Sequence, residues 1–295
     1  MKIHLTKVGE IILNPKHDGF FQYPTPFHFS KDRLGIIYTN RINNQSIANY
    51  VLLDKLDLKP AHYSYHNPLL PLGKLGTFTE NGATIQYIKA CDSQENSLYK
   101  NFSVLGTGYV ATCSVPYRTN ILTSSISFST SGDFLFAKEV LKVPTSKEDV
   151  ISTCTPAEVN GEMLYNSHTF WVKEANGEYN PSYCIRSLNN VLFSSWNTAY
   201  TRPWSFNYND DSILCISSRE LKNFRTGSGG YKPEFYLMSG SKKPAKIAHT
   251  VCSNMKNEQM IAYGTVLKVK DSHLFFYNSS FKSNICVASL EITNG

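Results

Sequence analysis

The strongest constraint on this chain is an internal repeat of short, strand-like segments. Segments in which apolar and aromatic residues alternate before a polar break occur five times, at 33–40, 97–103, 162–168, 234–239 and 272–278. An extended segment precedes each of them, at 22–27, 83–88, 152–159, 215–221 and 260–266. A third segment follows each of them, at 46–51, 119–124, 182–187, 245–250 and 283–289. Three strand types in a fixed order predict one supersecondary unit that is used five times.

Five small antiparallel sheets in series are typical of a five-bladed β-propeller, in which the first strand of each blade lines a central channel. The expected fold class is therefore all-β, with one domain over residues 1–295 and blades at about 14–60, 75–145, 147–200, 205–252 and 256–292. The fourth strands are less readable, and 134–136 and 191–193 are candidates for them. Residues 2–13 are expected to pair beside 283–292 and close the ring, which leaves no open sheet edges. The alternative is one or two β-sandwiches, which do not need the same threefold order five times.

Composition excludes several classes of protein. The chain has 295 residues, of which 13% are aromatic and 18% charged, so it can bury a core and is not globally disordered. No apolar stretch reaches the about 18 residues of a membrane span. The net charge of +6 comes from scattered Lys and Arg residues, which does not support a nucleic-acid track. No nucleic-acid partner is therefore expected.

The cysteines and the N-terminus predict a cytoplasmic protein. The seven cysteines are widely spaced, and none forms a C-x-x-C pair, which argues against a disulfide framework and a structural zinc site. Lys7 and Glu10 lie where an export signal has its apolar stretch. We expect free thiols in a reducing compartment, and no metal or other cofactor.

In a propeller, side chains from distant parts of the sequence meet where the first strands begin, so the residues near those positions are the candidates for chemistry. Two opposed carboxyl groups are what glycoside cleavage needs, one to donate a proton and one to attack or to activate water. The candidate catalytic carboxylates are Asp18, Glu80, Glu158 and Glu258. Each of them is alternatively a solvated loop residue. Candidate ligand-binding residues are Arg41, Arg118, Arg219 and His168, of which the arginines offer planar donor forks. Alternatively, the arginines hold a loop carbonyl in place by hydrogen bonding. His168 is alternatively a structural residue.

Several segments resemble a known family. They are Leu-Gly-Thr-Phe-Thr-Glu-Asn-Gly at 75–82, Val-Pro-Tyr-Arg at 115–118, Asn-Glu-Gln-Met-Ile-Ala-Tyr at 257–263 and, in the first blade, Tyr-Pro-Thr-Pro at 23–26. The chain resembles the five-bladed propeller proteins related to glycoside hydrolases of the arabinanase, invertase and mannoside-phosphorylase type. It is most similar to bacterial glycosidase-like members, which the resemblance associates with surface-polysaccharide gene sets. The resemblance adds Tyr117 and Gln259 to the candidate binding residues.

The chain also departs from the family pattern at four positions. Where the family has acidic residues this chain has Thr79, Gln259 and Ile42, and where the family has a His it has Phe20. Neither Thr, Ile nor an amide can transfer a proton as a carboxyl group does.

Three hypotheses about function follow. The favoured one is a carbohydrate-active, glycosidase-like enzyme acting on a sugar, sugar nucleotide or glycan precursor, in bacterial surface-polysaccharide metabolism. The alternatives are a non-catalytic sugar-binding or assembly protein on a degenerate glycosidase scaffold, and a propeller used only for protein interaction. The fold alone does not decide among them.

Overall fold

The computed structural model shows a chain built from β-strands. It describes residues 1–13, 20–42, 45–54, 60–63, 83–91, 99–110, 118–143, 156–159, 161–173, 179–186, 191–195, 198–220, 230–239, 243–255, 258, 260–279 and 284–294. These ranges contain strands and turns and no helix, which confirms the all-β prediction. Accordingly, the described part of the chain has no helix that is long and apolar enough to cross a membrane.

The strands form five separate sheets, four of which follow the chain in simple order. The first sheet contains β2 (Phe20–His28), β3 (Arg33–Ile42), β4 (Gln45–Asp54) and β5 (Pro60–Tyr63). The second contains β6 (Ala83–Ala90), β7 (Tyr99–Val110), β8 (Arg118–Ser129) and β9 (Phe134–Val143). The third contains β10 (Pro156–Val159), β11 (Glu162–Lys173), β12 (Tyr179–Arg186) and β13 (Val191–Ser195). The fourth contains β14 (Thr198–Tyr208), β15 (Asp211–Glu220), β16 (Lys232–Met238) and β17 (Ala245–Lys246).

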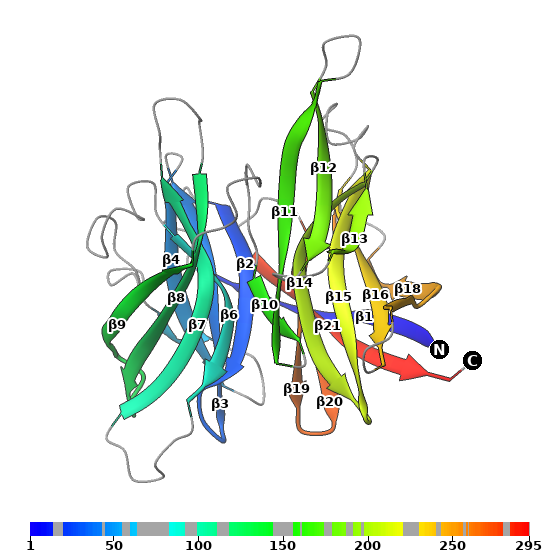
Figure 1. The fold of residues 1–295 in the computed structure, drawn as a ribbon. Coiled ribbons are helices and arrows are strands. Elements are labelled where there is room, and N and C mark those ends of the chain that lie inside the picture. Colours follow the sequence, from blue (N-terminus) through cyan, green and yellow to red (C-terminus); the bar gives the residue numbers. More distant parts are fainter. Residues whose placement is uncertain are drawn as a thin grey trace.

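The fifth sheet joins the two ends of the chain. It runs β18–β1–β21–β20–β19, with β18 (His249–Ser253), β1 (Lys2–Ile12), β21 (Asn284–Thr293), β20 (Ser272–Asn278) and β19 (Ala262–Val269). Strand β1 pairs antiparallel with β21, from Lys2 opposite Thr293 to Ile12 opposite Asn284, and parallel with β18. The first and last strands of the chain therefore lie side by side (Figure 1).

The first strands of the five sheets contact one another in a cycle. Strand β2 contacts β6, β6 contacts β10, β10 contacts β14, β14 contacts β19, and β19 contacts β2 again. Figure 1 shows these strands toward the middle of the molecule, with later strands farther out. A ring of sheets arranged around a central axis produces this cyclic order.

Apolar side chains fill the space between neighbouring sheets. One cluster joins the first and second sheets through residues such as Phe27 and Phe128, and another joins the fourth and fifth through Trp204 and Phe275. Further clusters lie between the fifth and first sheets and between the third and fourth. The aromatic residues that the composition pointed to are therefore used largely as inter-sheet packing.

In the fourth sheet, the strand order predicted from the sequence is wrong. Segment 215–221 was expected to be a first strand, but it belongs to β15, and β14 is the first strand of that sheet. The expected segments 234–239 and 245–250 move outward in the same way, to the third strand and to β17 and β18. Pro203 lies within β14, where a proline needs a bulge, but proline alone does not explain the missed strand, because β2 contains Pro24 and Pro26 and was predicted. Here the register of β14 against β15 shifts between Thr201 and Trp204.

Candidate functional site

Four of the five first strands have a register shift, and three of these shifts contain a residue with a positive φ angle. Those three shifts lie between Gln22 and Thr25 in β2, between Thr201 and Trp204 in β14 and between Ala262 and Thr265 in β19. Within the shifts, Tyr23, Arg202 and Tyr263 have positive φ angles of 56°, 55° and 56°. Such a φ is uncommon for residues other than glycine, and bulges re-aim a side chain out of the regular alternation. Three sheets thus present a large side chain from an equivalent position.

These three side chains meet although they come from different sheets. The rings of Tyr23 and Tyr263 have centroids 4.4 Å apart. The Arg202 guanidinium carbon lies 5.8 Å from the Tyr23 ring centroid and 5.5 Å from that of Trp204. The Arg202 side chain is fully buried, which is unusual for an arginine. We call Tyr23, Arg202, Trp204 and Tyr263 the inner-strand cluster.

Hydrogen bonds tie this cluster to four of the sheets. Arg202 Nη2 donates to the Pro24 carbonyl at 3.0 Å and to Thr25 Oγ1 at 2.7 Å. Thr265 Oγ1 donates to the same Pro24 carbonyl at 3.0 Å. Thr25 Oγ1 lies 3.1 Å from the carbonyl of Ile85 in β6 and donates to it. Burial lowers the pKa of Arg202 to about 9, so the side chain remains a cation at neutral pH.

The cluster continues outward to Arg219, one of the residues singled out from the sequence. The Tyr231 ring centroid is 5.7 Å from that of Tyr263, and the Arg219 guanidinium carbon lies 5.8 Å from the Tyr231 centroid. Ser217 Oγ accepts a hydrogen bond of 2.8 Å from the backbone N–H of Tyr263. An unbroken line of ring and guanidinium contacts therefore leads from the centre to the end of β15.

Arg41, Arg118 and Arg219 lie at corresponding ends of their sheets. We call the end at which a sheet's first strand begins its proximal end. Arg41 pairs with Phe20 at the start of β2, Arg118 with Val110 at the end of β7, and Arg219 with Ala199 near the start of β14. All three backbones are thus proximal, and the side chain described among them is that of Arg219, which is partly buried.

The other predicted residues are placed less favourably or are not described. Glu158 pairs with Met163 one step from the turn that joins β10 to β11, so its backbone is at the distal end of the third sheet and not near the start of β10. The backbone of His168 pairs with Tyr183 within β11. Asp18, Glu80, Tyr117 and Gln259 lie outside the described residues.

Glu258 is held by side chains from β1 and β20 of the fifth sheet. Its carboxylate accepts a hydrogen bond of 2.7 Å from Lys7 Nζ on β1, and Tyr277 Oη lies at 3.4 Å. Lys7 also pairs with Glu10, and carboxylate oxygens of Glu10 and Glu258 lie within 4.8 Å of each other and of Cys286 Sγ. Burial opposes the charge of Lys7, but the two hydrogen bonds raise its pKa, and the bond from Lys7 lowers the pKa of Glu10. The contacts of Glu258 therefore indicate an anchor for the segment before β19.

Sequence reasoning missed the cluster built around Arg202. A usable signal existed, because Tyr-Pro at 23–24, Arg-Pro at 202–203 and Tyr-Gly at 263–264 each place a large residue before Pro or Gly in a strand-like run. Pro and Gly inside strands mark bulges. Three such pairs at equivalent repeat positions would have predicted three bulged first strands.

Comparisons with known proteins show the fold. No protein-family model matches the chain, and no curated protein sequence matches it. Among solved structures, a thermostable family-43 glycoside hydrolase has a TM-score of 0.56 at 12% identity, covering 97% of this chain and 94% of that one. Bacillus subtilis levansucrase has a TM-score of 0.66 at 8% identity, covering 96% and 86%. The RS223 β-xylosidase has a TM-score of 0.53 at 11% identity, covering 97% and 96%.

These similarities extend over nearly the whole chain, and at such low identity they establish shared fold alone. They confirm, at the level of fold, the resemblance to glycosidase-like propellers that the sequence motifs indicated. The chain is a divergent protein with that fold.

Proposed function

We propose that this chain is a single-domain, five-bladed β-propeller that binds and processes a carbohydrate at the proximal end of its central channel. The observation that carries the proposal is the full-length likeness to proteins named for saccharide chemistry, a glycoside hydrolase and a levansucrase. Five sheets whose first strands contact one another in a cycle support the bladed arrangement. A role in bacterial surface-polysaccharide metabolism and a cytoplasmic location remain predictions from the sequence.

The inner-strand cluster supplies a suitable base for a sugar site. Ligand sites combine apolar and aromatic walls with a few placed polar groups, and Tyr23 and Tyr263 provide adjoining rings over a buried hydrogen-bond network. The three proximal arginines add fork-shaped donors for hydroxyl, carboxylate or phosphate oxygens. We assign ligand binding to Arg41, Arg118 and Arg219, and retain Tyr117, His168 and Gln259 as further candidates.

Catalysis is assigned to Asp18 and Glu80. The support for this assignment is their position in the sequence, where each precedes the first strand of a sheet. As a pair they would cleave or transfer a glycosidic bond, one donating a proton to the leaving oxygen and the other attacking carbon or activating water. The distal backbone of Glu158 and the anchoring contacts of Glu258 make these two carboxylates second choices.

A non-catalytic sugar-binding protein is the second candidate. The specific observation in its favour is that Thr79, Ile42 and Gln259 stand where the resembled family has acidic residues. In this candidate function the binding residues keep their role, but no glycosidic bond is cleaved.

The deciding experiment compares binding and turnover in the same preparation. Wild type, Asp18→Asn and Glu80→Gln are assayed against a panel of glycosides and sugar nucleotides, with calorimetry for binding. Glu162→Gln is the matched control, because Glu162 is exposed at the distal turn of the third sheet. We expect turnover to fall about a thousand-fold in both site variants and binding to change by less than about three-fold. Binding without turnover in wild type establishes the second candidate, and no binding of any panel member refutes both.

A further inference from the structure

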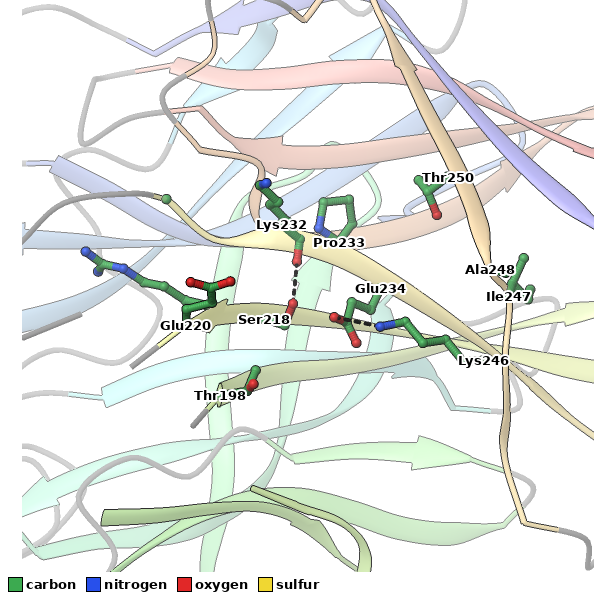
Figure 2. Close-up of a pocket in the computed structure, with 12 residues that line it drawn as sticks. Thr198, Ser218, Glu220, Lys232, Pro233, Glu234, Lys246, Ile247, Ala248 and Thr250 are labelled. Atoms are coloured by element: carbon green, nitrogen blue, oxygen red, sulfur yellow. Dashed lines mark hydrogen bonds and ion pairs between the residues drawn. The ribbon is translucent and has the colours of Figure 1, made fainter. Parts of the chain in front are cut away.

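A polar cavity lies on the fourth sheet, away from the inner-strand cluster. It has a volume of about 430 Å³ and is lined by residues from β14 to β18, including Thr198, Ser218, Glu234 and Lys246 (Figure 2). This volume is within the range of about 300–1,000 Å³ that is typical of small-molecule sites. Of the residues that the proposed function uses, Arg219 lines this cavity.

Glu234 is fixed on one side of the cavity. Lys246 Nζ lies 3.0 Å from Glu234 Oε1, and Tyr236 Oη donates a short hydrogen bond to Oε2. Although burial alone would raise the pKa of Glu234, the hydrogen bonds from Tyr236 and Lys246 lower it. Burial and the bond to Glu234 raise the pKa of Tyr236, so this hydroxyl stays protonated and keeps donating. The carboxylate is therefore an ionised acceptor with a defined direction.

Packing between sheets holds this arrangement in place. The Tyr236 ring centroid lies 4.5 Å from that of Phe193 on β13, and Phe193 also contacts Tyr200 at 6.3 Å. A side chain locked by packing needs little ordering when a ligand arrives, which favours binding. The cavity thus has a preformed polar wall.

Charges of both signs line the cavity. Lys232 and Lys246 carry ammonium groups, Arg219 a guanidinium, and Glu220 and Glu234 carboxylates, while Ser218 adds a hydroxyl. Figure 2 shows Lys232 and Glu234 on one strand, β16, and Ser218 on its neighbour β15. A strongly anionic or cationic ligand would meet repulsion from one of the two sets. A neutral polyol fits both, because each hydroxyl can donate to a carboxylate and accept from an ammonium group.

Arg219 connects this cavity to the centre of the molecule. It lines the cavity and lies over Tyr231, which contacts Tyr263 of the inner-strand cluster. One chain of contacts thus joins the two sites at the proximal end. A ligand with several sugar units could occupy both of them.

We propose that the cavity around Glu234 binds one neutral sugar unit of an oligosaccharide whose other end occupies the channel mouth. The inference rests on the proposed function and names its substrate class, which is an oligosaccharide and not a monosaccharide. Glu234 accepts hydrogen bonds from the sugar hydroxyls, and Lys232 donates to their oxygens.

The test is a length series. Calorimetry measures the affinity of wild type for defined oligosaccharides of one to six units built from fructose, xylose, arabinose, glucose or mannose. We expect an increase in affinity of about ten-fold or more at the length that first reaches the cavity. Glu234→Gln should weaken the affinity for the longer ligands about ten-fold, since a hydrogen bond to a charged group is lost. The affinity for the shortest ligand should stay unchanged. Lys232→Gln, at an exposed residue that cannot disturb the core, should weaken the affinity for the longer ligands by a smaller factor.

Two controls keep the outcomes separate. Glu162→Gln removes an exposed carboxylate of the third sheet and should reproduce the wild-type series. Binding that does not depend on length, or a length gain that both cavity variants retain, refutes the cavity proposal and leaves the channel site standing. No binding at any length refutes the proposed function, and the cavity proposal with it.

Discussion

Replacing Lys7 with methionine should lower the free energy of unfolding, because the two carboxylates around Lys7 then repel each other. Lys7 is the cation between Glu10 and Glu258, and methionine keeps its approximate length without its charge. Carboxylate oxygens of Glu10 and Glu258 lie within 4.8 Å of each other. At an effective dielectric constant of about 20, two unit charges at that separation repel by about 3.5 kcal/mol. The Glu10 side chain is 37% exposed, so solvent screening should reduce the measured loss of unfolding free energy to about 2 kcal/mol.

The loss of unfolding free energy in Lys7→Met should become smaller as the pH falls. In wild type the pKa of Glu10 is lowered, so its contribution to stability is present above the unfolded-state pKa and is lost as the pH falls through the folded-state pKa. In the variant the neighbouring carboxylate raises the pKa of Glu10 instead, which destabilises the fold at pH 7. Protonation relieves that repulsion as the pH falls. The difference between variant and wild type should therefore be largest near pH 7 and shrink toward pH 4.

Urea unfolding at pH 7, 5.5 and 4 measures the difference directly. Lys2→Met is the matched control, because Lys2 is an exposed lysine on the same strand. A double variant with Glu258→Gln should recover more than half of the loss, since one of the two repelling charges is removed. The reasoning is refuted if the effect of Lys7→Met equals that of Lys2→Met, or if it has the same size at all three pH values.

Three further changes test the packing and the site. Gly264→Ala should lower the free energy of unfolding by about 1–3 kcal/mol in urea titrations, because an added Cβ would lie 2.2 Å from the ring of Phe275; an unchanged midpoint contradicts the close approach. Thr25→Val keeps the shape but removes the hydroxyl that accepts from Arg202 and donates to Ile85, so we expect a loss of about 1–3 kcal/mol in the same assay. Arg219→Met should weaken oligosaccharide binding about ten-fold by calorimetry with the unfolding midpoint within 2 °C of wild type, and full retention of affinity counts against its binding role.

Strands with a clear local pattern of apolar and polar residues were predicted correctly from the sequence. The segments at 22–27, 83–88 and 260–266 correspond to β2, β6 and β19, because alternating side chains and turn residues define a strand without reference to its neighbours. Strand β1 was also foreseeable, since an amphipathic N-terminal run needs a partner and the end of the chain offers one. Strand β14 was missed, although it shares with β2 a proline at a register shift.

The centre of the molecule was harder to predict than its strands. Arg202 and Pro24 are 178 positions apart in the sequence, and they meet because β14 and β2 both belong to the cycle of contacting first strands. No local pattern specifies which side chains will share that space. The contacts of Glu258, with Lys7 on β1 and Tyr277 on β20, were likewise not specified by any local pattern.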